Sequence, residues 1–107
     1  IGPGALIAAQ VVVEVGARVG RIAAVGAGAV VGVSASIGDA SDLGARVVVG
    51  RRCRVGERAL IGAGAILHDG ILIGPDAIVE PGAVVVRDLG RGERWLRASS
   101  REWTAAD

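Results

Sequence analysis

The sequence contains one cysteine and one histidine, and it has no lysine, asparagine, phenylalanine, tyrosine or methionine. The single cysteine, Cys53, excludes an internal disulfide and is typical of a reducing cytoplasm, which is the predicted location. The single histidine, His68, excludes a zinc site built from three histidines, so no metal is expected. The formal net charge of +1 argues against a nucleic-acid partner, because such proteins need a concentrated basic surface.

Long hydrophobic runs are also missing. Hydrophobic residues make up 51% of the chain, but glycine and charged residues interrupt them every few positions. No segment resembles a signal peptide or a membrane-spanning helix, so no membrane partner is expected. The 107 residues suffice for one domain, of a size that is marginal for burying a core alone.

The sequence does contain an aliphatic residue at every sixth position. The first positions of the successive hexapeptides are Ile1, Ile7, Val13, Val19, Val25, Val31, Ile37, Leu43, Val49, Val55, Ile61, Leu67, Ile73, Val79 and Val85. Roughly a third of the chain is Ile, Leu or Val, so a chance run of this length has odds of about 10⁻⁷. The six-residue register is therefore a structural repeat.

The other positions of the repeat predict how the chain winds. Glycine follows the aliphatic residue in ten of the fifteen units, and the fifth position is mostly alanine. Alternate residues of a strand face the same side, so positions five and one both point inward around an outward position six. Positions two to four turn a corner, where glycine fits because it accepts left-handed backbone conformations. Residues 1–90 are thus predicted to form a triangular, all-β parallel helix of about five coils.

This pattern resembles the left-handed parallel β-helix of the hexapeptide-repeat acyltransferase superfamily. The segment "VGERALIGAGAILHDGILIGPDAIVEPGAVVVRDL" is most similar to the C-terminal half of bacterial acetyltransferases that act on sialic acid or on nucleotide-linked amino sugars. The resemblance implies a homotrimer with sites between adjacent prisms, acetyl-CoA as acyl donor, and a sugar or nucleotide-sugar acceptor. Because such enzymes commonly carry an N-terminal α/β domain that binds the nucleotide sugar, we expect one ahead of Ile1.

The family's catalytic histidine has no counterpart at its usual position. In the family this histidine accepts a proton from the attacking amine or hydroxyl, while backbone N–H groups stabilise the oxyanion. By resemblance its position falls on Val33, followed by Ser34, and two nearby polar family positions fall on Gly26 and Asp42. Valine cannot accept a proton, so an active chain needs another base.

His68, at the second position of "LHDGIL", is the candidate catalytic residue. We expect it at a corner, in one of two roles. It is either a solvent-facing residue without a catalytic role or a displaced general base, held by Asp69 or by a carboxylate of a neighbouring subunit.

Charged residues form columns when the chain is stacked every eighteen residues. Arg51, Asp69 and Arg87 share a column with Val33. They predict either a solvated ion-pair ladder or, for Arg51 and Arg87, contacts with the CoA phosphates, which guanidinium groups bind bidentately.

The segment "IGAGAI" resembles the family's CoA contacts, where small side chains let the pantetheine arm run close to the backbone. Carried over by position, the CoA-binding candidates are Gly62, Ala63 and Gly82, whereas Glu80 and Pro81 depart from the family pattern. The alternative is that these small residues serve the corner alone.

Cys53 occupies a fifth position and is predicted to pack inside the prism rather than to act as a nucleophile, since burial raises the pKa of a thiol. After Gly90 the repeat is predicted to stop. Residues 91–107 are expected to form a short C-terminal capping helix or tail, with Trp95, Leu96, Ser99 and Trp103 on one face, covering the open edge of the last coil.

Two functions stay open at this point. The first is an acyl-CoA-dependent O- or N-acetyltransferase acting on a sugar or nucleotide sugar. The second is a catalytically inactive β-helix that serves as a trimerisation platform or scaffold. The missing histidine at Val33 favours the second function, and "IGAGAI" favours the first.

Overall fold

The computed structural model describes residues 1–97, which contain fifteen strands of two residues each and no helix. The strands are β1 (Leu6–Ile7), β2 (Val12–Val13), β3 (Arg18–Val19), β4 (Ala24–Val25), β5 (Val30–Val31), β6 (Ser36–Ile37), β7 (Asp42–Leu43), β8 (Val48–Val49), β9 (Arg54–Val55), β10 (Leu60–Ile61), β11 (Ile66–Leu67), β12 (Leu72–Ile73), β13 (Ile78–Val79), β14 (Val84–Val85) and β15 (Arg94–Trp95). Since no helix is present in these residues, none is long and apolar enough to cross a membrane.

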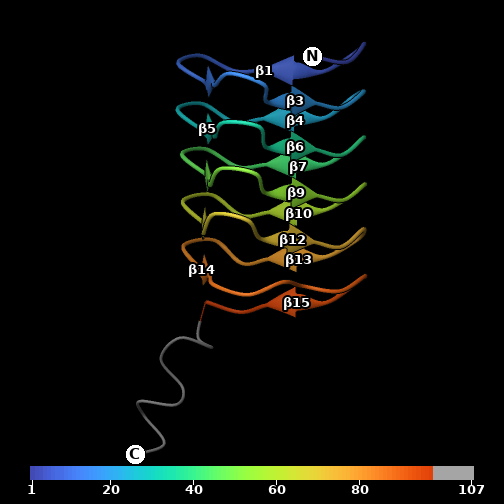
Figure 1. The fold of residues 1–107 in the computed structure, drawn as a ribbon, viewed down its shortest axis with the longest axis vertical. Coiled ribbons are helices and arrows are strands. Elements are labelled where there is room, and N and C mark those ends of the chain that lie inside the picture. Colours follow the sequence, from blue (N-terminus) through green and yellow to red (C-terminus); the bar gives the residue numbers. More distant parts are fainter. Residues whose placement is uncertain (98–107) are drawn as a thin grey trace, which may run out of the picture.

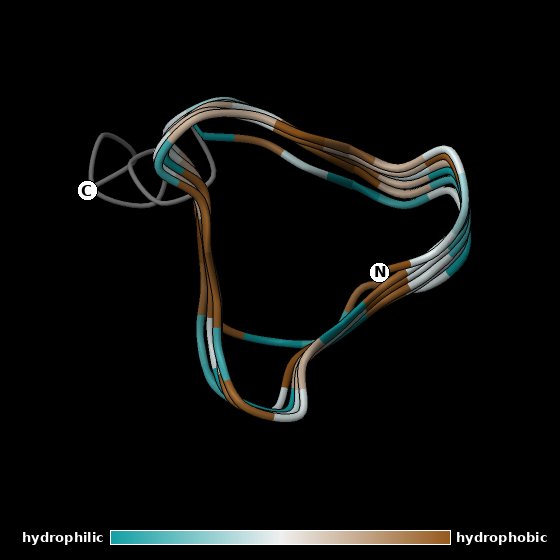
Figure 2. Cartoon of the chain, turned by 90° about the horizontal axis from the view of Figure 1, so that it is seen from above, coloured by the Kyte–Doolittle hydropathy of each residue, from teal (hydrophilic) through white to brown (hydrophobic). Residues whose placement is uncertain are grey.

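The strands form three parallel sheets, each of which takes every third strand of the chain. Face A contains β1, β4, β7, β10, β13 and β15; face B contains β2, β5, β8, β11 and β14; face C contains β3, β6, β9 and β12. Most paired residues are eighteen apart, as in Leu60 with Ile78. The coils therefore stack along one axis (Figure 1), and the cross-section is a triangle (Figure 2). This is the predicted solenoid of about five turns, consistent with a left-handed β-helix.

The core is a column of side chains from the first and fifth positions of each hexapeptide. From Val19 to Val85 every first-position residue is at most 3% exposed. The fifth-position residues between them, such as Ala29, Ala65 and Cys53, are also buried. Sixth-position residues point outward, so the predicted alternation is confirmed. The chain between the faces forms three edges: edge AB (8–10, 26–28, 44–46, 62–64, 80–82), edge BC (14–16, 32–34, 50–52, 68–70, 86–88) and edge CA (2–4, 20–22, 38–40, 56–58, 74–76, 90–92).

Glycine is needed at the second position for a different reason from the one predicted. The residue with left-handed backbone is at the fourth position of each hexapeptide, the last of its corner, from Gly4 (φ 75°) to Gly82 (φ 77°), and eight such residues are not glycine, Arg46 among them. At each of the ten second-position glycines, an added Cβ would lie 2.4–2.7 Å from a heavy atom of the next coil. Close stacking of the coils, and not a positive φ, selects glycine there.

The predicted C-terminal helix is wrong for residues 91–97, and residues 98–107 lie outside the described part of the chain. The repeat unit that begins at Val85 has four residues instead of six, so Leu89 pairs with Ile73 and takes an inward position. The repeat then continues to β15, which pairs with β13. The Glu93 and Trp95 carbonyls accept hydrogen bonds at 2.9 Å from the N–H groups of Ile78 and Glu80, and a helix at 91–97 would leave these two donors unpaired.

Candidate functional site

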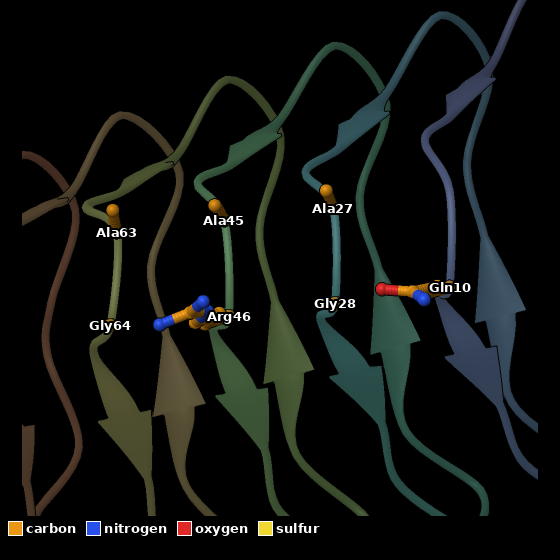
Figure 3. A pocket seen from close by; sticks show the side chains of 7 residues that line it. All are labelled: Gln10, Ala27, Gly28, Ala45, Arg46, Ala63 and Gly64. Carbon is orange, nitrogen blue, oxygen red and sulfur yellow. The ribbon is translucent and has the colours of Figure 1, made fainter.

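Edge AB carries an open groove of about 560 Å³. Its wall is formed by a row of alanines, Ala27, Ala45 and Ala63, which succeed one another from coil to coil (Figure 3). Gln10, Gly28, Arg46 and Gly64 line the rest. The predicted CoA contacts Gly62, Ala63 and Gly82 all belong to this edge, and the N–H of Gly82 donates to the carbonyl of Ala63 at 2.9 Å.

The groove also contains backbone donors that the coil-to-coil hydrogen bonds leave unpaired. At the other two edges, two third-position N–H groups are satisfied by an aspartate of the next coil: Arg21 N donates to Asp39 Oδ1 at 2.8 Å and Arg51 N to Asp69 Oδ1 at 2.9 Å. At edge AB no third position carries a carboxylate, because these residues are four alanines and Pro81. Within residues 1–97 the N–H groups of Ala27, Ala45 and Ala63 have no acceptor. Edge AB therefore presents a row of free amide donors beside small side chains.

Sequence reasoning missed Gln10 and Arg46, whose side chains lie in the groove (Figure 3). Both occupy fourth positions, in a column with Gly28, Gly64 and Gly82, and the column was visible at the eighteen-residue period. Arg46 makes no ion pair with the carboxylates of residues 1–97. Its guanidinium is available to an anionic ligand.

Edge BC carries the predicted charge column, which forms only in part. Arg51 Nε lies 3.7 Å from Asp69 Oδ2, and both side chains are about two-thirds exposed. Because the repeat unit that begins at Val85 is two residues short, Arg87 forms no ion pair with Asp69. Its guanidinium instead stacks over Trp95, 4.9 Å from the ring centroid, and donates to the Asp88 carbonyl at 3.2 Å. An exposed ion pair such as that of Arg51 with Asp69 contributes about 0–1 kcal/mol to the free energy of unfolding.

His68 lies exposed at edge BC, beside a shallow depression of about 470 Å³ that Val48, Gly50, Ile66, Leu67 and Asp69 also line. Asp69 is directed to Arg51 and not to the imidazole. The imidazole has no hydrogen-bond partner among residues 1–97, so no carboxylate of this part of the chain holds it as a general base.

Val33 also belongs to edge BC, where it is 36% exposed. Its neighbours in the column are Val15, which is 83% exposed, and Arg51. Gly26 lies at edge AB, and Asp42 points outward from face A. The positions to which the resemblance assigns catalytic roles thus lie on separate parts of one prism, and edges AB and BC are the two borders of face B.

Cys53 is completely buried, and its thiol donates to the His68 carbonyl at 2.8 Å. Burial raises the pKa of this thiol. Ser41, another buried fifth-position residue, donates in the same way to the Gly56 carbonyl at 2.6 Å. Cys53 therefore packs inside the prism as predicted. Within residues 1–97 no three His, Cys, Asp or Glu side chains gather in a way that suits a metal ion.

Residues 52–87 match the Hexapep family, described as bacterial transferase hexapeptide (six repeats). None of the curated proteins matches the chain. The predicted resemblance to hexapeptide-repeat transferases is confirmed by this match and by solved structures.

The acetyltransferase domain of PglB from Neisseria gonorrhoeae is 25% identical, with a TM-score of 0.88 over 90% of this chain and 47% of that one. PerB from Caulobacter crescentus, solved in complex with CoA and GDP-perosamine, is 29% identical, with a TM-score of 0.52 over 85% of this chain and 54% of that one. WeeI from Acinetobacter baumannii shares the fold at 17% identity, with a TM-score of 0.53 over 85% and 51% of the two chains. The chain thus spans about half the length of the solved structures it matches.

Proposed function

We propose that this hexapeptide-repeat chain is the acyl-CoA-binding β-helix of an acetyltransferase that acts on a sugar or nucleotide sugar. The observation that carries the proposal is the groove of edge AB, where the N–H groups of Ala27, Ala45 and Ala63 have no acceptor among residues 1–97 and the lining side chains are small except for Gln10 and Arg46. The similarity to PglB and to PerB, which was solved with CoA and GDP-perosamine, supports the same reading.

The chemistry of the groove suits CoA. Its donors recur once per coil, a spacing of about 4.8 Å, along the direction in which an extended chain would lie. Pantetheine is long and thin and has two amide carbonyls that accept hydrogen bonds from such donors. Arg46, at the same edge, offers a guanidinium for the phosphates, which such groups bind bidentately. The predicted Gly62, Ala63 and Gly82 would keep the backbone close to the ligand.

Assembly as a homotrimer would unite the separated candidate residues. The outward column of face B is entirely aliphatic: Val12, Val30, Val48, Ile66 and Val84. If three prisms turn face B toward a threefold axis, the column is buried. Each edge AB then lies beside edge BC of a neighbour. That arrangement places Arg51, His68 and Arg87 of one subunit opposite the groove of the next.

In this composite site the acceptor amine or hydroxyl attacks the thioester carbonyl, and His68 takes the proton from the attacking group. The C–S bond then breaks, and the leaving CoA thiolate receives that proton from His68. The free amides of edge AB would stabilise the oxyanion, because they are fixed donors that need no reorganisation. Arg51 and Arg87 would meet the CoA phosphates. Val33 contributes no proton transfer.

The second candidate, a catalytically inactive trimerisation platform, is favoured by Val33 and by the fact that no carboxylate of residues 1–97 is hydrogen-bonded to the His68 imidazole. Both candidate functions assume a trimer. The second does not require the groove of edge AB to bind CoA. Binding and turnover therefore have to be measured separately.

Calorimetry with CoA, at a protein concentration that light scattering shows to be trimeric, tests the groove. Ala45→Asp should satisfy the N–H of Ala27, as Asp69 does for Arg51, and fill the groove, so CoA affinity should fall at least about tenfold. Ala40→Asp adds the same charge at edge CA, on an exposed corner with φ 59°, and should leave the affinity unchanged. No heat at millimolar CoA, or equal losses in both variants, would reject the CoA site.

Turnover separates the two candidates once CoA binds. His68→Ala should abolish acetyl transfer to amino-sugar acceptors, and Val33→His should increase it if the geometry allows, since a general base contributes about 10²–10⁴-fold. CoA binding without turnover, unchanged by either substitution, would favour the inactive platform.

A further inference from the structure

Face C differs from face B in the chemistry of its outward column. At the sixth positions where face B has five aliphatic residues, face C has Arg18, Ser36 and Arg54 on three neighbouring strands, followed by Leu72. Ser36 pairs with Arg18 on one side and with Arg54 on the other. Two guanidinium groups thus flank one hydroxyl on a flat sheet.

The same residues line a polar depression of about 260 Å³ at the border of edge BC. Gly16, Ser34 and Ala35 complete the lining. Ser34 is exposed on a left-handed corner with φ 60°, and its hydroxyl adds a second uncharged donor. Apart from Gly16 and Ala35, every side chain of this depression is a hydrogen-bond donor.

Neither arginine is neutralised by a carboxylate of the described residues. No carboxylate of residues 1–97 lies within ion-pair distance of Arg18 or Arg54. Two nearby carboxylates are already engaged, Asp39 by the N–H of Arg21 and Asp69 by Arg51. Since the net charge of the whole chain is only +1, this positive site is local and not a general property of the surface.

We propose that the depression of face C binds the diphosphate group of a soluble phosphorylated ligand. The two arginine Cα atoms lie two strands apart, about 9.6 Å at normal strand spacing, so their guanidinium groups can each hold one phosphate bidentately. The hydroxyls of Ser34 and Ser36 donate to the phosphate oxygens between them. An anion also relieves the repulsion between two like charges that lie two strands apart on one face.

This site is distinct from the groove of edge AB, because edge AB lies opposite face C in the triangular cross-section (Figure 2). A trimer with face B at its axis would leave Arg18, Ser36 and Arg54 of face C facing outward, while Gly16 and Ser34, on edge BC, would lie beside the neighbouring subunit. The inference therefore does not depend on the proposed function, and the two sites can be tested in the same sample.

Inorganic pyrophosphate is the probe, titrated calorimetrically into the full chain in 0.15 M salt. Arg18→Gln and Arg54→Gln should each weaken binding about fivefold or more, and the double variant should show no binding. Arg94→Gln removes the same charge from an exposed arginine of face A, which has no role in either proposed site, and should leave pyrophosphate affinity unchanged.

Orthophosphate should bind more weakly than pyrophosphate, because it can engage only one guanidinium fully. Far-UV circular dichroism shows whether each variant keeps the β-helix. Arg18 and Arg54 are exposed, and their substitution removes no side-chain hydrogen bond or ion pair within residues 1–97. Wild-type affinity in the double variant, no binding to the wild type, or the same loss in Arg94→Gln would overturn the proposal.

Discussion

Gly38 allows the steric role of second-position glycine to be separated from backbone conformation. An alanine Cβ at this position would lie 2.6 Å from the carbonyl carbon of Gly56 and 2.7 Å from the nitrogen of Glu57, whereas ordinary contacts begin at 3.4 Å. Both obstructing atoms are backbone, so no side chain can rotate away. The two coils must separate at this corner by about 0.8 Å, the difference between 3.4 and 2.6 Å.

The cost follows from what holds the corner together. Gly38 N donates to Val55 O at 2.7 Å, and Arg58 N donates to Asp39 O at 3.0 Å. Weakening both bonds, at about 1 kcal/mol each, and overpacking, at about 1–3 kcal/mol, lead to an expected destabilisation of about 3–5 kcal/mol for Gly38→Ala.

Gly70→Ala is the matched control. Gly70 has φ +74°, and nothing lies within 4 Å of an added Cβ. The expected loss there is about 1–2 kcal/mol, the cost of left-handed backbone for an L-residue. Urea unfolding followed by far-UV circular dichroism, at one protein concentration because assembly shifts the midpoint, compares the two. An equal or larger loss at Gly70 would refute the coil-stacking argument.

Two further predictions concern the core and the proposed interface. Because burial raises the pKa of the Cys53 thiol, the neutral form favours the folded state, and this contribution disappears as the pH rises through the folded pKa. Iodoacetamide at pH 8 should therefore label Cys53 only as fast as the chain unfolds, and labelling of the native chain at the rate of the urea-unfolded chain would contradict its burial. Val48→Arg on face B should convert a trimer to monomers in light scattering, whereas Leu60→Arg, at a comparably exposed position of face A, should not. A trimer that survives Val48→Arg would remove face B from the interface.

The sequence was sufficient to predict the coil geometry because the signal is repeated. A single aliphatic residue is weak evidence for a fold, but Val19 and the residue at every sixth position after it must all fill the same interior column. The inward fifth position follows from the two-residue period of a strand, and Cys53 lies where that period places it. Each additional coil repeats the same test of the register.

The C-terminal coil was not predicted, because counting strictly in sixes fails after a repeat unit of four residues. Leu89 was counted at a fifth position, although Leu89-Gly90 repeats the aliphatic-glycine pair and Trp95 follows six residues later. The reason for second-position glycine was also wrong, since contact between coils at Gly38 is not visible in the local sequence. The free amides of edge AB depend on what the next coil carries, so they appear only when the coils are stacked.

The hydrogen bonds that join one coil to the next have a consequence for how such chains change length. Each coil contacts only the coils before and after it, with partners sixteen to eighteen residues apart, as for Leu89 with Ile73 and Leu60 with Ile78. Insertion of a whole coil would lengthen every edge and leave each residue on its own face. Insertion of one hexapeptide would instead turn everything after it by one face, moving Arg46 from edge AB to edge BC when it precedes that residue. Large length variants of this fold should therefore come in steps of three hexapeptides, and small ones should be confined to corners such as 86–88.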